Sequence, residues 1–170
     1  VGQWQRRFGG ATLGSGFLQS SRLEYPTQVI RNAVRNVGGI AIAHAYDTRF
    51  TPAVFASLYY GSEQQGEATR PDLGHRLIGL RLGGQLTYSD KLNSFASVSH
   101  EQRDYGGATP GFIDNRADRQ TDYRVGVNYI PAKSWTVTPQ LMYTANVSNV
   151  TFSAFTRTQA LVTVRRDFRW

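Results

Sequence analysis

Hydrophobic and polar positions alternate along most of this chain. Between residues 135 and 147, apolar side chains fill the odd positions from Trp135 to Val147, whereas Thr, Gln, Met and Asn fill the even positions. Successive side chains of a β-strand point to opposite faces, so this segment is predicted to be a long strand with one apolar and one polar face. Pro139 fits less well, because proline cannot donate a hydrogen bond inside a sheet. The same alternation predicts strands in 38–47, 54–63, 75–88, 122–129 and 156–170.

The remaining segments are less regular. Segment 92–105 is predicted to be extended, although Phe95 and Val98 fall on different parities. Residues 29–37 fit both helical and strand spacing, and we favour a strand that enters at about residue 30. Nine extended segments are therefore predicted: 1–8, 11–25, 30–47, 52–63, 75–88, 92–105, 119–130, 135–146 and 156–168.

The connections between these segments alternate in length. Residues 47–51, 89–92 and 131–134 are tight, whereas residues 64–74 and 106–118 are long and rich in polar residues, Gly and Pro. Long strands joined by short turns at one end and long loops at the other are typical of transmembrane β-barrels. A soluble β-sandwich, the alternative, more often has strands of about five or six residues. The predicted fold class is thus all-β, an antiparallel transmembrane β-barrel in which residues 1–170 form one domain.

The number of segments restricts the barrel. If the short turns lie in the periplasm, nine spans place residue 1 on the opposite side of the membrane from the C-terminus. A single-chain bacterial barrel has an even number of strands, which excludes nine. Either residues 1–8 do not span, which gives a small eight-stranded barrel, or the chain is the C-terminal portion of a larger barrel and is incomplete at its N-terminal side.

Aromatic residues make up 12% of the chain, and many lie near predicted strand ends on the apolar parity. Tyr and Trp are enriched at the two membrane interfaces of outer-membrane barrels, where they form girdles. The predicted girdle consists of Tyr46, Tyr60, Tyr88, Tyr123, Tyr129, Trp135 and Tyr143, with Phe168 near the end of the last strand.

Charged residues fall on the opposite, polar parity. The chain has 19 Lys and Arg against 12 Asp and Glu, a formal charge of +7. Because the basic residues are dispersed over several segments, we do not expect a nucleic-acid interface. The charges predicted to line the lumen are Arg81, Asp122, Arg124, Arg157, Arg165 and Asp167, with Glu101 and Arg103 less securely placed. They either pair with one another and fill space in a hydrated interior, or form a basic lining that favours anionic solutes.

Other classes of protein are excluded or disfavoured by composition. No apolar run approaches the length of a membrane-spanning helix. The absence of cysteine excludes disulfides, thiolate catalysis and cysteine-ligated zinc, and we expect neither a metal nor a cofactor. Ser99, His100 and Glu101 are adjacent, but neighbours on a strand face opposite sides, so they are not predicted to form a catalytic relay. His44 falls on the apolar parity, where we expect an interfacial role, and His75 lies beside a loop, so we expect no enzymatic activity.

The C-terminal segment has a pattern of its own. Val162, Val164, Phe168 and Trp170 share one parity and end in an aromatic residue. This pattern resembles the signal by which the barrel-assembly machinery recognises its substrates, a mode that uses backbone pairing at a strand edge and pockets for alternate side chains. The same residues also suit a closing strand.

From Arg119 onward the sequence "RQTDYRVGVNYIPAKSWTVTPQLMYTANVSNVTFSAFTRTQALVTVRRDF" resembles a known family. The strand opening at Thr121-Asp122-Tyr123, the "TPQLMYT" strand, the Ser148-Asn149-Val150 loop and the closing "RTQALVTVRRDF" are similar to the barrel end of surface lipoprotein assembly modifiers. In that family the barrel follows periplasmic tetratricopeptide repeats. The resemblance implies a larger barrel that acts as an outer-membrane translocon for lipoproteins.

The first functional hypothesis is therefore a transport or translocation protein in the outer membrane of a Gram-negative bacterium. Its expected partners are outer-membrane lipids, the barrel-assembly machinery and a lipoprotein substrate. A second hypothesis is a small closed barrel with a structural or adhesive role that depends on loops 64–74 and 106–118. A third is a barrel enzyme that modifies lipids.

Overall fold

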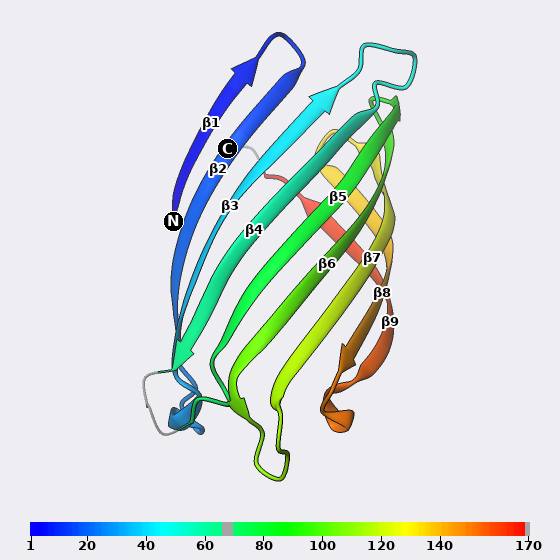
Figure 1. The fold of residues 1–170 in the computed structure, drawn as a ribbon. Coiled ribbons are helices and arrows are strands. Elements are labelled where there is room, and N and C mark those ends of the chain that lie inside the picture. Colours follow the sequence, from blue (N-terminus) through cyan, green and yellow to red (C-terminus); the bar gives the residue numbers. More distant parts are fainter. Residues whose placement is uncertain (66–69, 169–170) are drawn as a thin grey trace.

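The computed structural model describes residues 1–65 and 70–168, which form one antiparallel sheet with its strands in sequence order (Figure 1). Two short 3₁₀ helices, η1 (Val29–Arg31) and η2 (Thr151–Ser153), lie in connections. The nine strands are β1 (Gly2–Phe8), β2 (Thr12–Leu23), β3 (Ala33–Ala45), β4 (Ala53–Gln65), β5 (His75–Ser89), β6 (Leu92–Ala108), β7 (Asn115–Ala132), β8 (Trp135–Ser148) and β9 (Phe155–Arg166).

The predicted strands are confirmed, and three of their boundaries differ by more than two residues. Strand β3 begins at Ala33 rather than near residue 30, because η1 occupies the ambiguous segment and ends at Arg31. The predicted long loop at 106–118 is shorter, because β6 continues to Ala108 and β7 begins at Asn115. Pro139 lies within β8, opposite Val162 of β9, so the strand continues through the proline.

Residues 2–8 also form a strand of the sheet, β1, which pairs with β2 from Gly2↔Leu18 to Phe8↔Thr12. The sheet therefore has nine strands, and the alternative in which residues 1–8 lie outside an eight-stranded sheet is wrong. The short connections gather at one end of the sheet, and the longer connections, with η1 and η2, gather at the other (Figure 1).

The sheet is strongly curved (Figure 1), but the described residues do not close it into a barrel. Within this part of the chain, β1 pairs only with β2 and β9 pairs only with β8. Each of these two edge strands, β1 and β9, thus has one edge without a backbone partner among the described residues. None of the described residues form a helix long and apolar enough to cross a membrane.

The two faces of the sheet differ in the way that the alternation predicts. We call the face that carries Leu58, Leu80 and Leu141 the outer face, and its large apolar side chains are exposed, Leu141 by 48%. The inner face carries Tyr59, Arg81 and Asp122 and is polar and partly buried. Among the described residues the only buried hydrophobic side chains are Ala33, Leu77 and Val150. The molecule therefore has almost no apolar core, and its apolar surface faces outward.

Aromatic rings of the inner face lie over glycines on the neighbouring strand. A Cβ added at Gly79 would overlap the ring of Tyr59, and a Cβ at Gly83 would overlap the ring of Phe55. Each ring and its glycine are direct cross-strand partners. Glycine in a strand marks a place where another group approaches closely, and here it lets the rings lie against the sheet. The same relationship joins Phe17 to Gly39 and Phe95 to Gly126.

Candidate functional site

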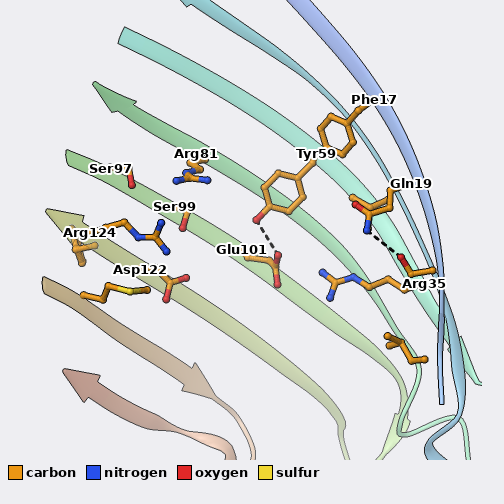
Figure 2. A pocket seen from close by; sticks show the side chains of 15 residues that line it. Phe17, Gln19, Arg35, Tyr59, Arg81, Ser97, Ser99, Glu101, Asp122 and Arg124 are labelled. Atoms are coloured by element: carbon orange, nitrogen blue, oxygen red, sulfur yellow. Dashed lines mark hydrogen bonds between the residues drawn. The ribbon is translucent and has the colours of Figure 1, made fainter. Parts of the chain in front are cut away.

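The inner face is hollowed between strands β2 and β8, and we call this space the inner hollow (Figure 2). Its volume is about 660 Å³. The side chains that line it alternate along their strands with the exposed apolar side chains of the outer face, so strand geometry alone brings them together. The charged lining residues are Arg35, Arg81, Glu101, Asp122 and Arg124.

Glu101 lies at the centre of a hydrogen-bonded group. Tyr59 Oη donates a hydrogen bond to Glu101 Oε2 at 2.9 Å, and Arg103 Nε donates to Glu101 Oε1 (Figure 2 shows the first contact). The Glu101 residue is only 9% exposed. A buried carboxylate requires such partners, because an unpaired charge in a poorly hydrated site is costly. The charge of Glu101 is thereby neutralised by Arg103.

Asp122 is held differently, by neutral donors. Thr144 Oγ1 donates a hydrogen bond to Asp122 Oδ1 at 2.6 Å, and Gln120 Nε2 donates to Oδ2 at 2.9 Å. Both donors hold the carboxylate in place without cancelling its charge.

Three arginines line the inner hollow, and none of them, Arg35, Arg81 or Arg124, forms an ion pair with any residue of 1–65 or 70–168. Arg81 lies on β5 and Arg124 on β7. In the register, Arg81 lies opposite Ser99 and Arg124 lies opposite Ser97, so both flank β6. The Arg81 guanidinium carbon lies 5.5 Å from the centre of the Phe55 ring. This cation–π contact orients the side chain and leaves its hydrogen-bond donors free.

A second charged cluster lies toward the long-loop end of β6 and β7. Arg116 forms two hydrogen bonds with Asp118, whose side chain is 1% exposed, and the Arg116 guanidinium carbon lies 4.4 Å from the centre of the Tyr105 ring. Such a bidentate pair is a strong, directional contact. The pair itself lies within β7, and the contact of Arg116 with Tyr105 links β7 to β6 at the ends that carry the connecting loop.

A similar pair lies in the connection between β4 and β5. Arg70 Nε and Nη2 donate hydrogen bonds to the two carboxylate oxygens of Asp72, each at 2.8 Å. These bonds from Arg70 lower the pKa of Asp72 below its ordinary value. This turn packs against Gly106 and Gly107 of β6, where a Cβ would approach Pro71 and Asp72 to about 3.0 Å.

The structure brings together some of the residues predicted to line a lumen and separates others. Arg81, Asp122 and Arg124 line the inner hollow, and Glu101 shares it. Arg157 on β9 lies opposite Thr144, one strand beyond the hollow. Arg165 and Asp167 pair with each other at 3.0 Å near the end of the chain.

Tyr59, Ser97, Ser99 and Arg35 also belong to the inner hollow but were not selected from the sequence. Strand parity alone could have identified Tyr59 and Arg35. The inward orientation of the two serines was not evident from the sequence, because Phe95 breaks the alternation of β6. The Phe95 side chain points to the inner face, where its ring covers Gly126.

The residues of the predicted aromatic girdle lie on the outer face in two groups. Tyr60 and Tyr123 are followed, toward the long loops, by more polar outward positions, Ser62 and Thr121. Tyr143 on β8 is the cross-strand partner of Tyr123 and is followed by the apolar outward residues Ala145 and Val147. The centres of the Tyr123 and Tyr143 rings are 6.3 Å apart. The group nearer the short turns contains Tyr46, Tyr88, Tyr129 and Trp135.

The residues proposed as an assembly signal lie on or after β9. Val162, Val164 and Phe168 are all exposed, and the guanidinium of Arg166 lies over both the Trp135 and Phe168 rings, 5.2 and 4.7 Å from their centres. Trp170 lies outside the described residues.

The histidines are dispersed. His100 is on the outer face and contacts Thr121 at 3.0 Å, whereas Ser99 and Glu101 point to the inner face, so the three do not form a relay. His44 contacts Thr12 at 2.8 Å, and the His75 ring packs against Tyr105. No group of three or more acidic or histidine side chains that could hold a metal ion occurs in the part of the chain that the structure describes.

We compared the chain with known protein families, curated proteins and solved structures. No protein family, curated protein or solved structure matches the chain.

Proposed function

We propose that this chain is part of an outer-membrane β-barrel and that its inner face lines a passage for polar molecules. The observation that carries the proposal is that the apolar face of the sheet is exposed and the polar face lies inside, the reverse of a soluble protein. Leu58, Leu80 and Leu141 are exposed, whereas polar and charged groups such as Glu101 and Asp122 lie in the hollow. A soluble sheet buries its apolar face against another layer. In a bilayer, acyl chains cover that face instead.

The extent of the apolar band supports the same environment. On β5 the outward positions from Ile78 to Tyr88 are apolar or glycine, and the next outward position toward the long loops is Arg76. From Ile78 to Tyr88 the strand advances ten residue steps (88 − 78), or about 33 Å at about 3.3 Å per residue. A strand tilted by about 40° would cross about 25 Å, the height of the apolar band of outer-membrane barrels.

The topology supports a barrel with more strands than these nine. Consecutive strands are antiparallel, so β1 and β9, the first and ninth, run in the same direction. Joining β1 directly to β9 would make a parallel seam, whereas single-chain bacterial barrels are antiparallel throughout and even in number. An odd number of further strands between β9 and β1 would satisfy both edges.

The more specific proposal is that the passage serves the delivery of lipoproteins to the cell surface. It is supported by the resemblance of residues 119–168 to the barrel end of surface lipoprotein assembly modifiers. Those residues form β7, β8 and β9, which provide Asp122 and Arg124 to the inner hollow.

Two experiments test the membrane-barrel proposal and the lipoprotein-delivery proposal separately. The full chain, meaning these strands together with the further strands proposed to close the barrel, is refolded into phosphatidylcholine vesicles. It is expected to show the heat-dependent gel mobility of a folded barrel and to release trapped small solutes. If it remains water-soluble and folded without lipid, the membrane proposal is wrong.

Deleting the gene in its native bacterium is expected to remove lipoproteins from the protease-accessible cell surface. Unchanged accessibility would contradict lipoprotein delivery while leaving the barrel intact.

A further inference from the structure

Two of the three arginines of the inner hollow, Arg81 on β5 and Arg124 on β7, lie on either side of β6. Glu101 is neutralised by Arg103, and Asp122 is bound by Thr144 and Gln120. Arg81 and Arg124 have no carboxylate partner among the residues described. Their guanidinium groups therefore keep their charge and most of their donors.

The register directs both arginines toward one space. Arg81 and Arg124 lie on the two strands that flank β6. Their partners on β6 are Ser99 and Ser97, so the two arginines are offset by two residues along the strands. Neighbouring strands are about 4.8 Å apart, so the two Cα atoms are about 12 Å apart, and both side chains can reach a ligand between them. Ser97 and Ser99, which lie between them, leave this space open and add hydroxyl donors (Figure 2).

We propose that Arg81, Arg124, Ser97 and Ser99 form a binding site for an anionic group, a phosphate or a carboxylate, on the wall of the passage. Guanidinium groups bind both anions through paired hydrogen bonds, and serine hydroxyls complete the contacts. The site deepens the proposed function, because it defines a class of solute that the passage favours. Charged side chains facing a lumen select ions in this way.

Asp122 limits the affinity of the site. Its carboxylate keeps its charge and lies two residues from Arg124 on the same strand. Asp122→Asn is therefore expected to tighten anion binding, because it removes this repulsion while an amide can still accept a hydrogen bond from Thr144.

The site is tested by equilibrium dialysis of the detergent-solubilised full chain against inorganic phosphate. Saturable binding is expected, weakened by about tenfold or more in R81Q/R124Q, because each arginine contributes a charged hydrogen bond. The matched control is R76Q/R119Q, which removes exposed arginines from the outer face of the same two strands and should leave binding unchanged. Competition with acetate distinguishes a carboxylate ligand from a phosphate ligand.

Absence of phosphate binding by the wild-type chain, or equal binding by R81Q/R124Q, would overturn the site. If the double variant does not fold, tighter binding by D122N supports the site and unchanged binding contradicts it. In planar bilayers with a KCl gradient, the wild-type chain should favour chloride over potassium and R81Q/R124Q should lose this preference. Channels with an unaltered preference contradict the site, whereas arginine-dependent binding without channels contradicts only the passage.

Discussion

The phenol ring of Tyr59 on β4 lies over Gly79 on β5, its direct cross-strand partner. This position lets Tyr59 Oη reach past β5 to Glu101 on β6, to which it donates a hydrogen bond at 2.9 Å. A side chain at position 79 would occupy the space of the ring. The glycine therefore makes a contact possible between two strands that are not neighbours, and this contact holds Glu101 at the centre of the inner hollow.

Gly79→Ala is expected to destabilise the folded sheet by about 1–3 kcal/mol, the usual cost of forcing extra atoms into a packed site. The added Cβ would displace the Tyr59 ring and break its hydrogen bond to Glu101. Urea unfolding of the chain in vesicles, followed by tryptophan fluorescence, measures the change. Gly16→Ala on β2 is the control, because the atom nearest its Cβ would be 3.8 Å away. Equal stability of Gly79→Ala and wild type would contradict the packing of the ring.

Alternation predicted the strands and their faces because a strand with different surroundings on its two sides must repeat every second residue. It could not predict contacts that cross several strands. Tyr59 and Glu101 are 42 positions apart, and only the register shows that Gly79 separates them. The boundary at residues 29–31 was also ambiguous, since Val29 and Ile30 suit a helical turn and a strand equally.

Ion pairs were only partly predictable for the same reason. Arg165 and Asp167 are two positions apart on one parity, so their contact follows from strand geometry. That Arg81 and Arg124 remain without carboxylates depends on the offset of β5, β6 and β7, which no local pattern encodes. The sequence therefore indicates a charged inner face but not which of its charges are free.

Leu141→Arg is expected to reduce the free energy of folding into vesicles by about 2–4 kcal/mol, the cost of an arginine on the lipid-facing side near the midplane. Leu141 lies on the outer face of β8, and its neighbour Gln140 lies on the inner face. Gln140→Arg is therefore expected to be tolerated. The midpoint of urea unfolding compares the two variants, and equal losses would refute the assignment of the faces.

The chain has no cysteine, so single cysteines can report the surroundings of each face. In vesicles, Arg81→Cys is expected to react readily with a charged, water-soluble maleimide, whereas Leu80→Cys should react slowly. Leu80 is 44% exposed, so only a covering of lipid would protect it. Both variants should react equally after unfolding in detergent and urea, which is the control. Rapid reaction of Leu80→Cys in the folded chain would show that water reaches the outer face.

Acid is expected to loosen the turn between β4 and β5. The hydrogen bonds from Arg70 lower the pKa of Asp72 in the folded chain, relative to about 3.9 in an unfolded chain. The pair therefore stabilises the turn fully above about pH 4, and this contribution is lost as the pH falls through the lowered pKa. Hydrogen exchange of the Leu73 amide, which donates to the Arg70 carbonyl, should accelerate beyond the intrinsic pH effect as the carboxyl is protonated. Asp72→Asn should show rapid exchange at all pH values, and a pH-dependent change that persists in this variant would contradict the role of Asp72.

Phe168→Ala is expected to slow insertion by the barrel-assembly machinery while leaving unassisted folding into vesicles nearly unchanged. Phe168 is 67% exposed and contacts the guanidinium of Arg166, so its removal leaves no cavity in the sheet. Its side chain is instead available to a partner that pairs with the free edge of β9, where alternate side chains such as Val162 and Val164 would enter pockets. Pulse-labelling in cells, with heat-dependent gel mobility as the readout, measures the rate of assembly. Phe155→Ala, at the N-terminal end of β9, is the control and should assemble at the wild-type rate. Equal slowing of both variants would mean that β9 stabilises the sheet generally and that its C-terminal end is not recognised as a signal.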